Sequence, residues 1–282
     1  MNKIENQTFP FERDLYAKRD LILNNCRFEG EEDGESALKE CKNIELNDCF
    51  MDLRYPLWHD DKVVLNNIVQ TENARASLWY SKNIEINKST LNGIKALREC
   101  QNIKINNTKA VSPEFGWKND NLTINDSEIE SQYIFFMTKN FKAYNSRFIG
   151  KYGFQYMENV VIENCILDTK DAFWHGKHIT VKDSLVKGEY LAWYSEDLTF
   201  INCKIIGTQP LCYCKNLKLI NCTMEGADLA FEYSDVDADI NGEIISVKNP
   251  RSGLIRADKI GEIINENSVY PVEAKIIIKN KN

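Results

Sequence analysis

A seven-residue phrase returns along this chain at a nearly constant interval, and this repeat limits the possible folds more than any other feature. The phrase NIKINNT at residues 102–108 returns as NLTINDS at residues 121–127. Related phrases begin at residues 20, 43, 62, 83, 102, 121, 140, 159, 178, 197, 216 and 235. Self-similarity at a short fixed period is the signature of a solenoid, in which each repeat forms one coil. The spacing predicts about twelve coils of roughly 19 residues each.

Each coil begins with a pattern that is typical of a short β-strand. If the first residue of the phrase is column 0, columns 1 and 3 are almost always aliphatic, as at Ile84 and Ile86. Such alternation indicates a strand with one buried face. Column 8 is apolar again, as at Leu91, and column 10 is glycine in six coils, as at Gly93. Each coil therefore reads as three strands separated by an asparagine turn and a glycine turn, with no room for a helix.

We predict an all-β fold, a single-stranded right-handed parallel β-helix of about twelve coils. Left-handed solenoids with three equal six-residue sides do not fit this coil length, and their glycine-led hexad is missing. We expect residues 1–282 to form one domain, with an N-terminal cap at 1–19, regular coils at 20–235, and irregular C-terminal coils and a cap at 236–282. Caps are expected because a bare solenoid end exposes unpaired backbone and core.

Asparagine accounts for 31 of the 282 residues, and it gathers at the predicted coil corners. It recurs in column 0 and, together with aspartate, in column 5, as at Asn102 and Asn107. Asparagine tolerates the left-handed backbone that tight corners require. Stacked identical asparagine side chains also hydrogen-bond along a ladder, as they do in cross-β structures. We therefore expect asparagine both to turn the chain and to join successive coils.

Composition and charge restrict the classes of function. With 43% hydrophobic and 27% charged residues the chain is globular, and its net charge of −7 argues against non-specific binding of nucleic acid. The polar first residues do not resemble a signal peptide, and no run of 18 apolar residues is present, so we expect a cytoplasmic protein with no membrane partner. The nine cysteines form no CxxC pair, which favours free thiols, and we expect neither a metal nor a cofactor.

One side of the coil carries nearly all of the distinctive side chains. Column 14 is apolar or glycine and is predicted to point inward, so alternation sends columns 13 and 15 outward. All five tryptophans lie in column 15, which is the fourth residue before the next phrase, and column 16 adds tyrosines and two histidines. The predicted substrate-binding residues on this aromatic face are Lys39, Glu40, Trp58, Trp79, Tyr80, Arg98, Trp117, Tyr156, Trp174, Trp193, Tyr194 and Tyr213.

Three interpretations of this aromatic face stay open. In the first, an oligo- or polysaccharide binds to the face, because sugar rings stack on aromatic rings and a repeat of about 4.8 Å suits an extended polymer. In the second, the chain is a non-enzymatic scaffold that binds a protein partner, since Trp, Tyr and Arg are enriched at binding hot spots. In the third, the chain's own C-terminal segment or a wider turn covers the face, which is then part of the core.

Two cations interrupt the aromatic residues of column 15. Lys39 and Arg98 occupy equivalent places in two similar phrases and lie in the same column as Trp58, Trp79 and Trp117. Cation–π packing explains such cations. Binding of an acidic sugar explains them as well, because arginine pairs with a carboxylate through two parallel hydrogen bonds.

The candidate acid–base residues are dispersed, so the sequence leaves open whether the protein is an enzyme that modifies a carbohydrate. The candidates are His59, Asp60, Glu99, Glu114, Asp171 and His175. A glycosidase needs two carboxyl groups about 5–10 Å apart. Glu99 and neighbours such as Glu114 could meet this distance across adjacent coils, as could many other pairs on an acidic solenoid. A polysaccharide lyase of this architecture would need clustered aspartates for calcium, and no such cluster stands out in the sequence.

The repeated N-h-x-h-x-N-[CST] coils, where h is an apolar residue, resemble the pectate-lyase-like right-handed β-helix superfamily over nearly the whole chain. Five phrases are similar to those of a bacterial family of unknown function with this fold: GESALKE at 34–40, WHD at 58–60, PEFGW at 113–117, FWH at 173–175 and LCYC at 211–214. The resemblance implies the fold and a bacterial cytoplasmic setting, and it implies no activity or catalytic residues. The chain lacks the Gly-His-Gly and paired-aspartate motifs of polygalacturonases.

Overall fold

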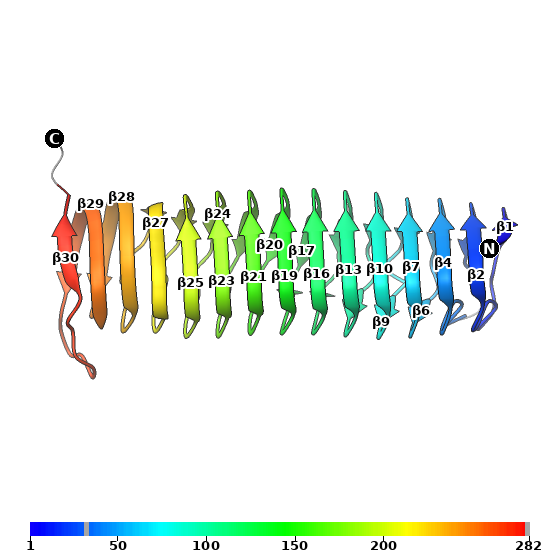
Figure 1. Ribbon diagram of the computed structural model, residues 1–282, viewed down its shortest axis with the longest axis horizontal. Coiled ribbons are helices and arrows are strands. Elements are labelled where there is room, and N and C mark those ends of the chain that lie inside the picture. The colour runs from blue at the N-terminus through cyan, green and yellow to red at the C-terminus, as the bar shows by residue number, and fades with distance from the viewer. Residues whose placement is uncertain (31–33, 280–282) are drawn as a thin grey trace. The chain divides into compact units, whose positions relative to one another are not determined.

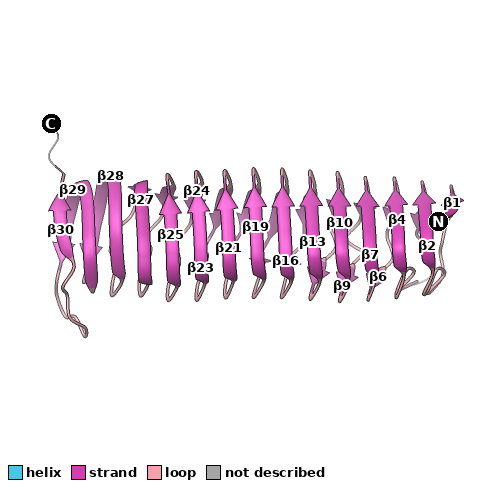
Figure 2. Cartoon of the chain, viewed as in Figure 1, coloured by secondary structure: helices cyan, strands magenta, loops and turns pink. Residues whose placement is uncertain are grey.

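The computed structural model describes residues 1–30 and 34–279, and every regular element in these ranges is a β-strand (Figure 2). Residues 31–33 of the first predicted coil and 280–282 of the predicted C-terminal cap lie outside the described residues. The chain divides into two compact units, unit 1 at Met1–Lys142 and unit 2 at Ala143–Asn282. Within each unit the chain rises along one row of strands, returns behind it and advances by one strand at each turn, which makes the winding right-handed (Figure 1). The predicted right-handed parallel β-helix is confirmed, with about 14 turns in the two units together.

The first side of each coil is a row of long parallel strands. In unit 1 these strands are β1 (Asn2–Glu5), β2 (Arg19–Asn24), β4 (Lys42–Asn47), β7 (Asp61–Asn66), β10 (Lys82–Asn87), β13 (Gln101–Asn106) and β16 (Asp120–Asn125), with β19 (Lys139–Tyr144) at the division between the units. In unit 2 they are β21 (Glu158–Glu163), β23 (Lys177–Lys182), β25 (Glu196–Ile201), β27 (Lys215–Glu225), β28 (Asp235–Lys248), β29 (Ser252–Ile264) and β30 (Lys275–Ile278).

Shorter strands form the other sides of the coil. The second side holds β3 (Arg27–Phe28), β5 (Phe50–Met51), β8 (Val69–Gln70), β11 (Thr90–Leu91), β14 (Lys109–Val111) and β17 (Glu128–Ser131) in unit 1, and β20 (Arg147–Gly150), β22 (Ile166–Thr169), β24 (Leu185–Lys187) and β26 (Lys204–Ile206) in unit 2. The third side holds β6 (Leu57–Trp58), β9 (Leu78–Trp79), β12 (Leu97–Arg98), β15 (Glu114–Phe115) and β18 (Tyr133–Ile134), all in unit 1.

The strand register follows the repeat. Ile84 of β10 aligns with Ile103 of the following strand β13 and with Val63 of the preceding strand β7. These are the partners that the phrase positions predict at these places, including the slightly longer coil between β7 and β10. β1 already pairs with β2 in the regular register, with Asn2 opposite Leu21, so regular winding extends into the segment that we expected to be only a cap.

The core is built from the apolar columns. The side chains of columns 1, 3, 8 and 14 point inward and are buried, as Ile84, Ile86, Leu91 and Leu97 show. A further buried row, formed by the residue that follows column 16, is largely small and polar: Cys41, Asp60, Ser81, Cys100, Asn119, Thr138, Ser195, Cys214 and Ser234. The coil is thus apolar along its sides and carries a narrow polar seam beside one corner.

Asparagine has both of the roles that the sequence predicts for it. Asn102 of column 0 and Asn107 of column 5 have φ angles of 55° and 49°, which is the left-handed region. The amide groups also form ladders, and Asn102 Nδ2 donates to Asn83 Oδ1 at 3.1 Å. A longer ladder, which the sequence pattern did not predict, lies in column 4: each member from Asn47 to Asn125 donates to the preceding coil at 2.8–3.0 Å.

The third side differs from the predicted strand. In unit 2 every second residue of this side has a left-handed backbone conformation, as the φ angles of Asp171 (53°), Phe173 (63°) and His175 (54°) show. Backbone hydrogen bonds then run alternately to the following and the preceding coil, from Asp171 N to Glu189 O and from Phe173 N to Gly153 O. Because column 16 lies at the last of these left-handed turns, its side chains point outward, whereas simple alternation sends them inward.

Within the described residues, no helix is long and apolar enough to cross a membrane.

Candidate functional site

The column-15 residues of unit 1 form a continuous stack on the third side of the coil. The rings of Trp58 and Trp79 are parallel, with 5.1 Å between centroids and 2° between planes. The guanidinium of Arg98 lies 5.1 Å from the ring centroid of Trp79 and 5.4 Å from that of Trp117. Lys39 Nζ lies 6.0 Å from the Trp58 ring at the other end. The stack follows the direction in which coils succeed one another, so these ring faces point at their neighbours.

The indole N–H groups are also used within the protein. Each tryptophan donates its Nε1–H to a backbone carbonyl of the following coil at 2.6–2.8 Å. The pairs are Trp58 with Ala76, Trp79 with Lys95, Trp117 with Tyr133, Trp174 with Tyr190, and Trp193 with Gln209. All five tryptophans are half-buried. The predicted tryptophan contacts to a sugar therefore compete with contacts that hold successive coils together.

The most exposed aromatic side chains on this side are in column 16. In unit 2, Tyr156, His175, Tyr194 and Tyr213 form what we call the tyrosine–histidine ladder. Successive ring centroids are 4.9, 5.2 and 4.6 Å apart, and the planes lie within 16° of parallel. Tyr156 and Tyr194 are each 47% exposed. Tyr156, His175 and Tyr194 are thus exposed in three successive coils, and Tyr213 is half-buried.

The ladder is open to solvent over most of its length. At its C-terminal end Tyr213 is followed by Tyr233, whose ring packs against Tyr270 at 5.0 Å and whose hydroxyl accepts a hydrogen bond from Val269 N–H. Burial and the nearby Glu232 carboxylate raise the pKa of Tyr213 to about 12. The C-terminal segment therefore touches the ladder's continuation at Tyr233, and Tyr156 and Tyr194 stay exposed. In unit 1 only a pair of this kind is found in the described residues, with His59 stacked on Tyr80 at 4.9 Å.

The predicted glutamates of unit 1 lie beside cations. Glu99 Oε1 is 3.4 Å from Arg98 Nε, and Glu114 Oε2 is 3.9 Å from Lys95 Nζ. Glu40 is exposed, and its backbone N–H donates to the carbonyl of Trp58 in the next coil. Glu99 and Glu114 each therefore lie in an ion pair with a neighbouring cation.

Two of the predicted acid–base residues are inside the coil. Asp60 is 1% exposed and belongs to the polar seam, where its Oδ1 accepts the Cys41 N–H at 2.7 Å. Burial raises the pKa of Asp60 to about 9. Asp171 is also buried, and burial raises its pKa. His59 of unit 1 and His175 of unit 2 are exposed and stacked on tyrosines. Of the six candidates, two are therefore buried, two lie in ion pairs and two are exposed beside tyrosines.

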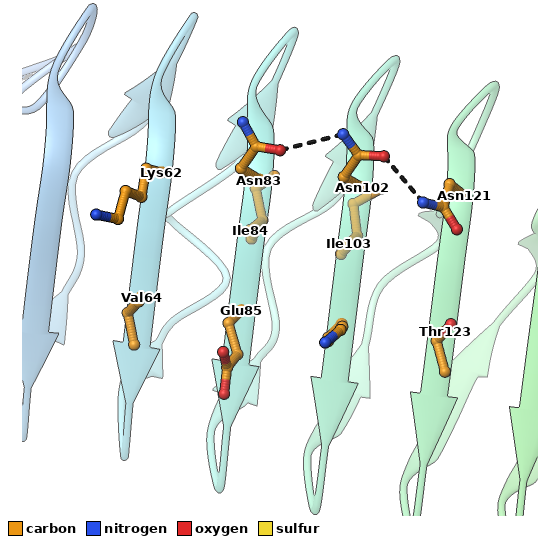
Figure 3. Close-up of a pocket in the computed structure, with 10 residues that line it drawn as sticks. Lys62, Val64, Asn83, Ile84, Glu85, Asn102, Ile103, Asn121 and Thr123 are labelled. Carbon is orange, nitrogen blue, oxygen red and sulfur yellow. Dashed lines mark hydrogen bonds between the residues drawn. The ribbon is translucent and has the colours of Figure 1, made fainter.

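A groove that the sequence analysis did not predict lies on the outer face of β7, β10, β13 and β16 (Figure 3). It has a volume of about 340 Å³, and a second hollow of about 450 Å³ shares Lys62 and Asn83 with it. The outward residues of both hollows come from columns 0 and 2 and the residue before column 0: Lys42, Asn43, Asp61, Lys62, Val64, Asn83, Glu85, Asn102, Lys104, Asn121 and Thr123. The repeat locates these side chains on one face, but no sequence pattern marks where that face is hollowed.

The described part of the chain contains no group of three or more His, Cys, Asp or Glu residues that could hold a metal ion. All nine cysteines are free and buried. Desolvation raises the pKa of the Cys49 and Cys165 thiols to about 11, so these groups stay protonated near neutral pH.

Comparisons with known proteins agree with this architecture. A family model described as "Protein of unknown function (DUF3737)" matches residues 2–278. None of the curated proteins matches the chain. Among solved structures, PfbA, a surface adhesin of Streptococcus pneumoniae, is 10% identical over 88% of this chain and 86% of its own, with a TM-score of 0.52. The A-module of the Azotobacter vinelandii mannuronan C-5 epimerase AlgE6 is 10% identical over 99% and 89%, with a TM-score of 0.46. At this identity the similarity to the adhesin shows the fold alone.

Proposed function

This chain belongs to the DUF3737 family, and we propose that it is a carbohydrate-binding protein that holds a linear polysaccharide along the tyrosine–histidine ladder without modifying it. The ladder itself carries the proposal. Four successive coils present a phenol or imidazole edge at intervals of 4.6–5.2 Å. A site that repeats at a constant interval favours a ligand that repeats as well, because each added unit of the polymer gains the same contact.

The structure supports contact through ring edges and polar atoms more than through ring faces. Neighbouring rings already cover the faces of His175 and Tyr194, whereas Tyr156 and Tyr194 expose 47% of their surface. Phenol hydroxyls donate and accept hydrogen bonds, and so do sugar hydroxyls. We therefore assign the sugar contacts to the tyrosines and histidine of column 16. The tryptophans of column 15 do not contact the sugar and form a rigid support beneath the ladder.

The proposal assigns no chemical step to the protein. A glycosidase needs one carboxyl group that donates a proton and a second one nearby, both in contact with the sugar. Asp60 and Asp171 are buried, and Glu99 and Glu114 lie beside cations. These observations favour binding over catalysis.

The test is a titration with linear oligosaccharides of increasing length, followed by calorimetry. We expect affinity to rise from dimer to tetramer, because the ladder spans four coils, and to level off beyond that length. Tyr194→Phe removes one hydroxyl, and we expect it to weaken tetramer binding by about two- to tenfold, as the loss of one hydrogen bond does. Tyr16→Phe removes a hydroxyl from a tyrosine that is 41% exposed outside the ladder and serves as the matched control.

If the ligand is instead a protein partner, we expect a different result from these variants. A folded protein partner would bury the whole tyrosine–histidine ladder. One central aromatic residue would then contribute most of the binding free energy. Absence of binding across neutral and acidic linear oligosaccharides, or equal effects of Tyr194→Phe and Tyr16→Phe, would contradict the carbohydrate proposal.

A further inference from the structure

The groove on unit 1 presents polar groups in a regular array. Asn83, Asn102 and Asn121 stand side by side on β10, β13 and β16, and their amides are joined in a ladder (Figure 3). Asn121 Nδ2 donates to Asn102 Oδ1 at 2.9 Å, and Asn102 Nδ2 donates to Asn83 Oδ1 at 3.1 Å. All three side chains are exposed.

Each amide in this ladder keeps hydrogen-bonding capacity for a ligand. An asparagine side chain has two N–H donors and two acceptor lone pairs. The hydrogen bonds of Asn102 within the ladder use one donor and one acceptor, which leaves one of each. Parallel strands are about 4.8 Å apart, so a donor and acceptor pair recurs at that interval along the groove. A sugar hydroxyl is likewise both a donor and an acceptor.

The charged side chains that line the groove are Lys62, Lys104 and Glu85, so the lining carries one more positive charge than negative. Asp61 is already paired with Lys82 and accepts a hydrogen bond from Asn83, and Glu85 accepts one from Asn87. Lys62 and Lys104 are exposed, and residues 1–30 and 34–279 provide no carboxylate within ion-pair distance of either. Elsewhere in the chain many lysines pair with an acidic residue of an adjacent coil, as Lys187 does with Asp168. The two lysines are two strands apart, which is about 10 Å.

We propose that this groove is a second binding site, separate from the tyrosine–histidine ladder, and that its ligand is a linear acidic polysaccharide. The amides of Asn83, Asn102 and Asn121 bind the hydroxyls. Lys62 and Lys104 bind carboxylates on the same edge of the polymer, through charge-assisted hydrogen bonds. The site spans the four strands from β7 to β16, or about 14 Å.

The composition of the groove favours this ligand over other polyanions. Single-stranded nucleic acids bind to grooves with aromatic platforms for the bases, and no aromatic side chain lines this groove. Lipid tails need an apolar wall, whereas Val64 is the one outward apolar side chain among the lining residues, because Ile84 and Ile103 are buried. An acidic peptide offers carboxylates but lacks hydroxyls for the amide array.

The experiment compares three probes on the full chain: a linear hexauronate, the same hexamer with its carboxyls methyl-esterified, and hexaglutamate. We expect the hexauronate to bind more tightly than either of the others. The double substitution K62M/K104M should lower hexauronate affinity by about tenfold or more and flatten its dependence on salt, because two charge-assisted contacts are lost. It should leave binding of the ester unchanged. Asn102→Ala should weaken binding of both hexamers.

The matched control is Lys218→Met. Lys218 is exposed, occupies the same column 2 as Lys104, and lies on β27 outside the groove. Far-UV circular dichroism and thermal melting verify that each variant is folded. An equal loss of affinity with Lys218→Met, unchanged hexauronate binding in K62M/K104M, or tighter binding of hexaglutamate would each overturn the proposal. Tyr194→Phe should not alter the part of the binding that depends on Lys62 and Lys104. The proposal for this groove and the proposal for the ladder can therefore be tested independently.

Discussion

Asp60 provides the sharpest test of how the polar seam is built. Its carboxyl is buried, Oδ1 accepts the N–H of Cys41, and Oδ2 has no hydrogen-bond partner. Asn119 occupies the same column and accepts the N–H of Cys100 through Oδ1 at 2.8 Å. The seam therefore uses a neutral amide and a carboxyl for the same purpose. We predict that Asp60→Asn stabilises the protein at neutral and alkaline pH.

The size of the effect follows from the pKa of Asp60, which burial raises to about 9 in the folded protein. In the unfolded chain an aspartate has a pKa of about 4. Below that value both states hold the proton, and Asp60 causes no loss of stability. Between the two values the unfolded chain releases a proton that the folded chain keeps, so the unfolding free energy falls by about 1.4 kcal/mol per pH unit. From pH 5 to pH 8 the loss is about 4 kcal/mol, and it is complete above about pH 9.

Urea unfolding of the wild type and Asp60→Asn, followed by circular dichroism at several pH values, measures this loss. We expect the difference between the two proteins to grow with pH in favour of Asp60→Asn. The reverse substitution, Asn119→Asp, should introduce a new loss of stability with the same sign of pH dependence. Parallel pH profiles of the wild type and Asp60→Asn would refute the conclusion that the folded protein holds this carboxyl neutral.

Three further predictions concern the packing of the coils. Trp79→Phe keeps an aromatic ring in the stack but loses the hydrogen bond to Lys95 O, so we expect the unfolding free energy in urea to fall by about 1 kcal/mol. An unchanged unfolding free energy would contradict a role for the indole N–H. Gly188→Ala places a Cβ 1.9 Å from Thr169 O and should cost about 3 kcal/mol or more, whereas Gly226→Ala meets nothing within 4 Å and should cost about 1 kcal/mol from its φ of 64°. All nine thiols are buried, so a disulfide reagent at neutral pH should modify them only at the rate of unfolding, and rapid labelling of the native protein would contradict that burial.

The repeat predicted the fold because one alternating pattern per coil determines what every coil buries. Ile84 and Ile86 face inward because their strand alternates, and Ile103 and Ile105 align with them because the same phrase returns one coil later. The left-handed corners were also predictable, because asparagine recurs at the same two positions of successive coils. The predicted twelve coils are close to the roughly 14 turns of the structure, and the additional strands are β1, β29 and β30, which carry no regular phrase and still pair in parallel with their neighbours.

The third side was predicted less well because its backbone does not follow period-two alternation. Phe173 and His175 are both left-handed, and the sequence contains no glycine at either place to indicate it. Side chains around these turns do not alternate, and Asp171, Ala172 and Phe173 are all buried in succession. The sequence predicted the column-16 tyrosines on the outward aromatic face, but residue types alone do not reveal the backbone angles that place them there.

The aromatic columns show why residue content alone is an ambiguous guide to a binding face in a parallel solenoid. On an isolated strand, an exposed tryptophan offers a free ring face, and a run of them is typical of a sugar-binding platform. In the parallel register of this chain the same column places ring over ring, so Trp58 and Trp79 cover each other's faces, and Arg98 continues the stack. A long aromatic column thereby satisfies its own stacking, and its outer edges are what a ligand can reach. A ligand must then bind to polar groups whose hydrogen-bonding capacity is not fully used within the protein. The tyrosines of column 16 and the amides of column 0 are such groups.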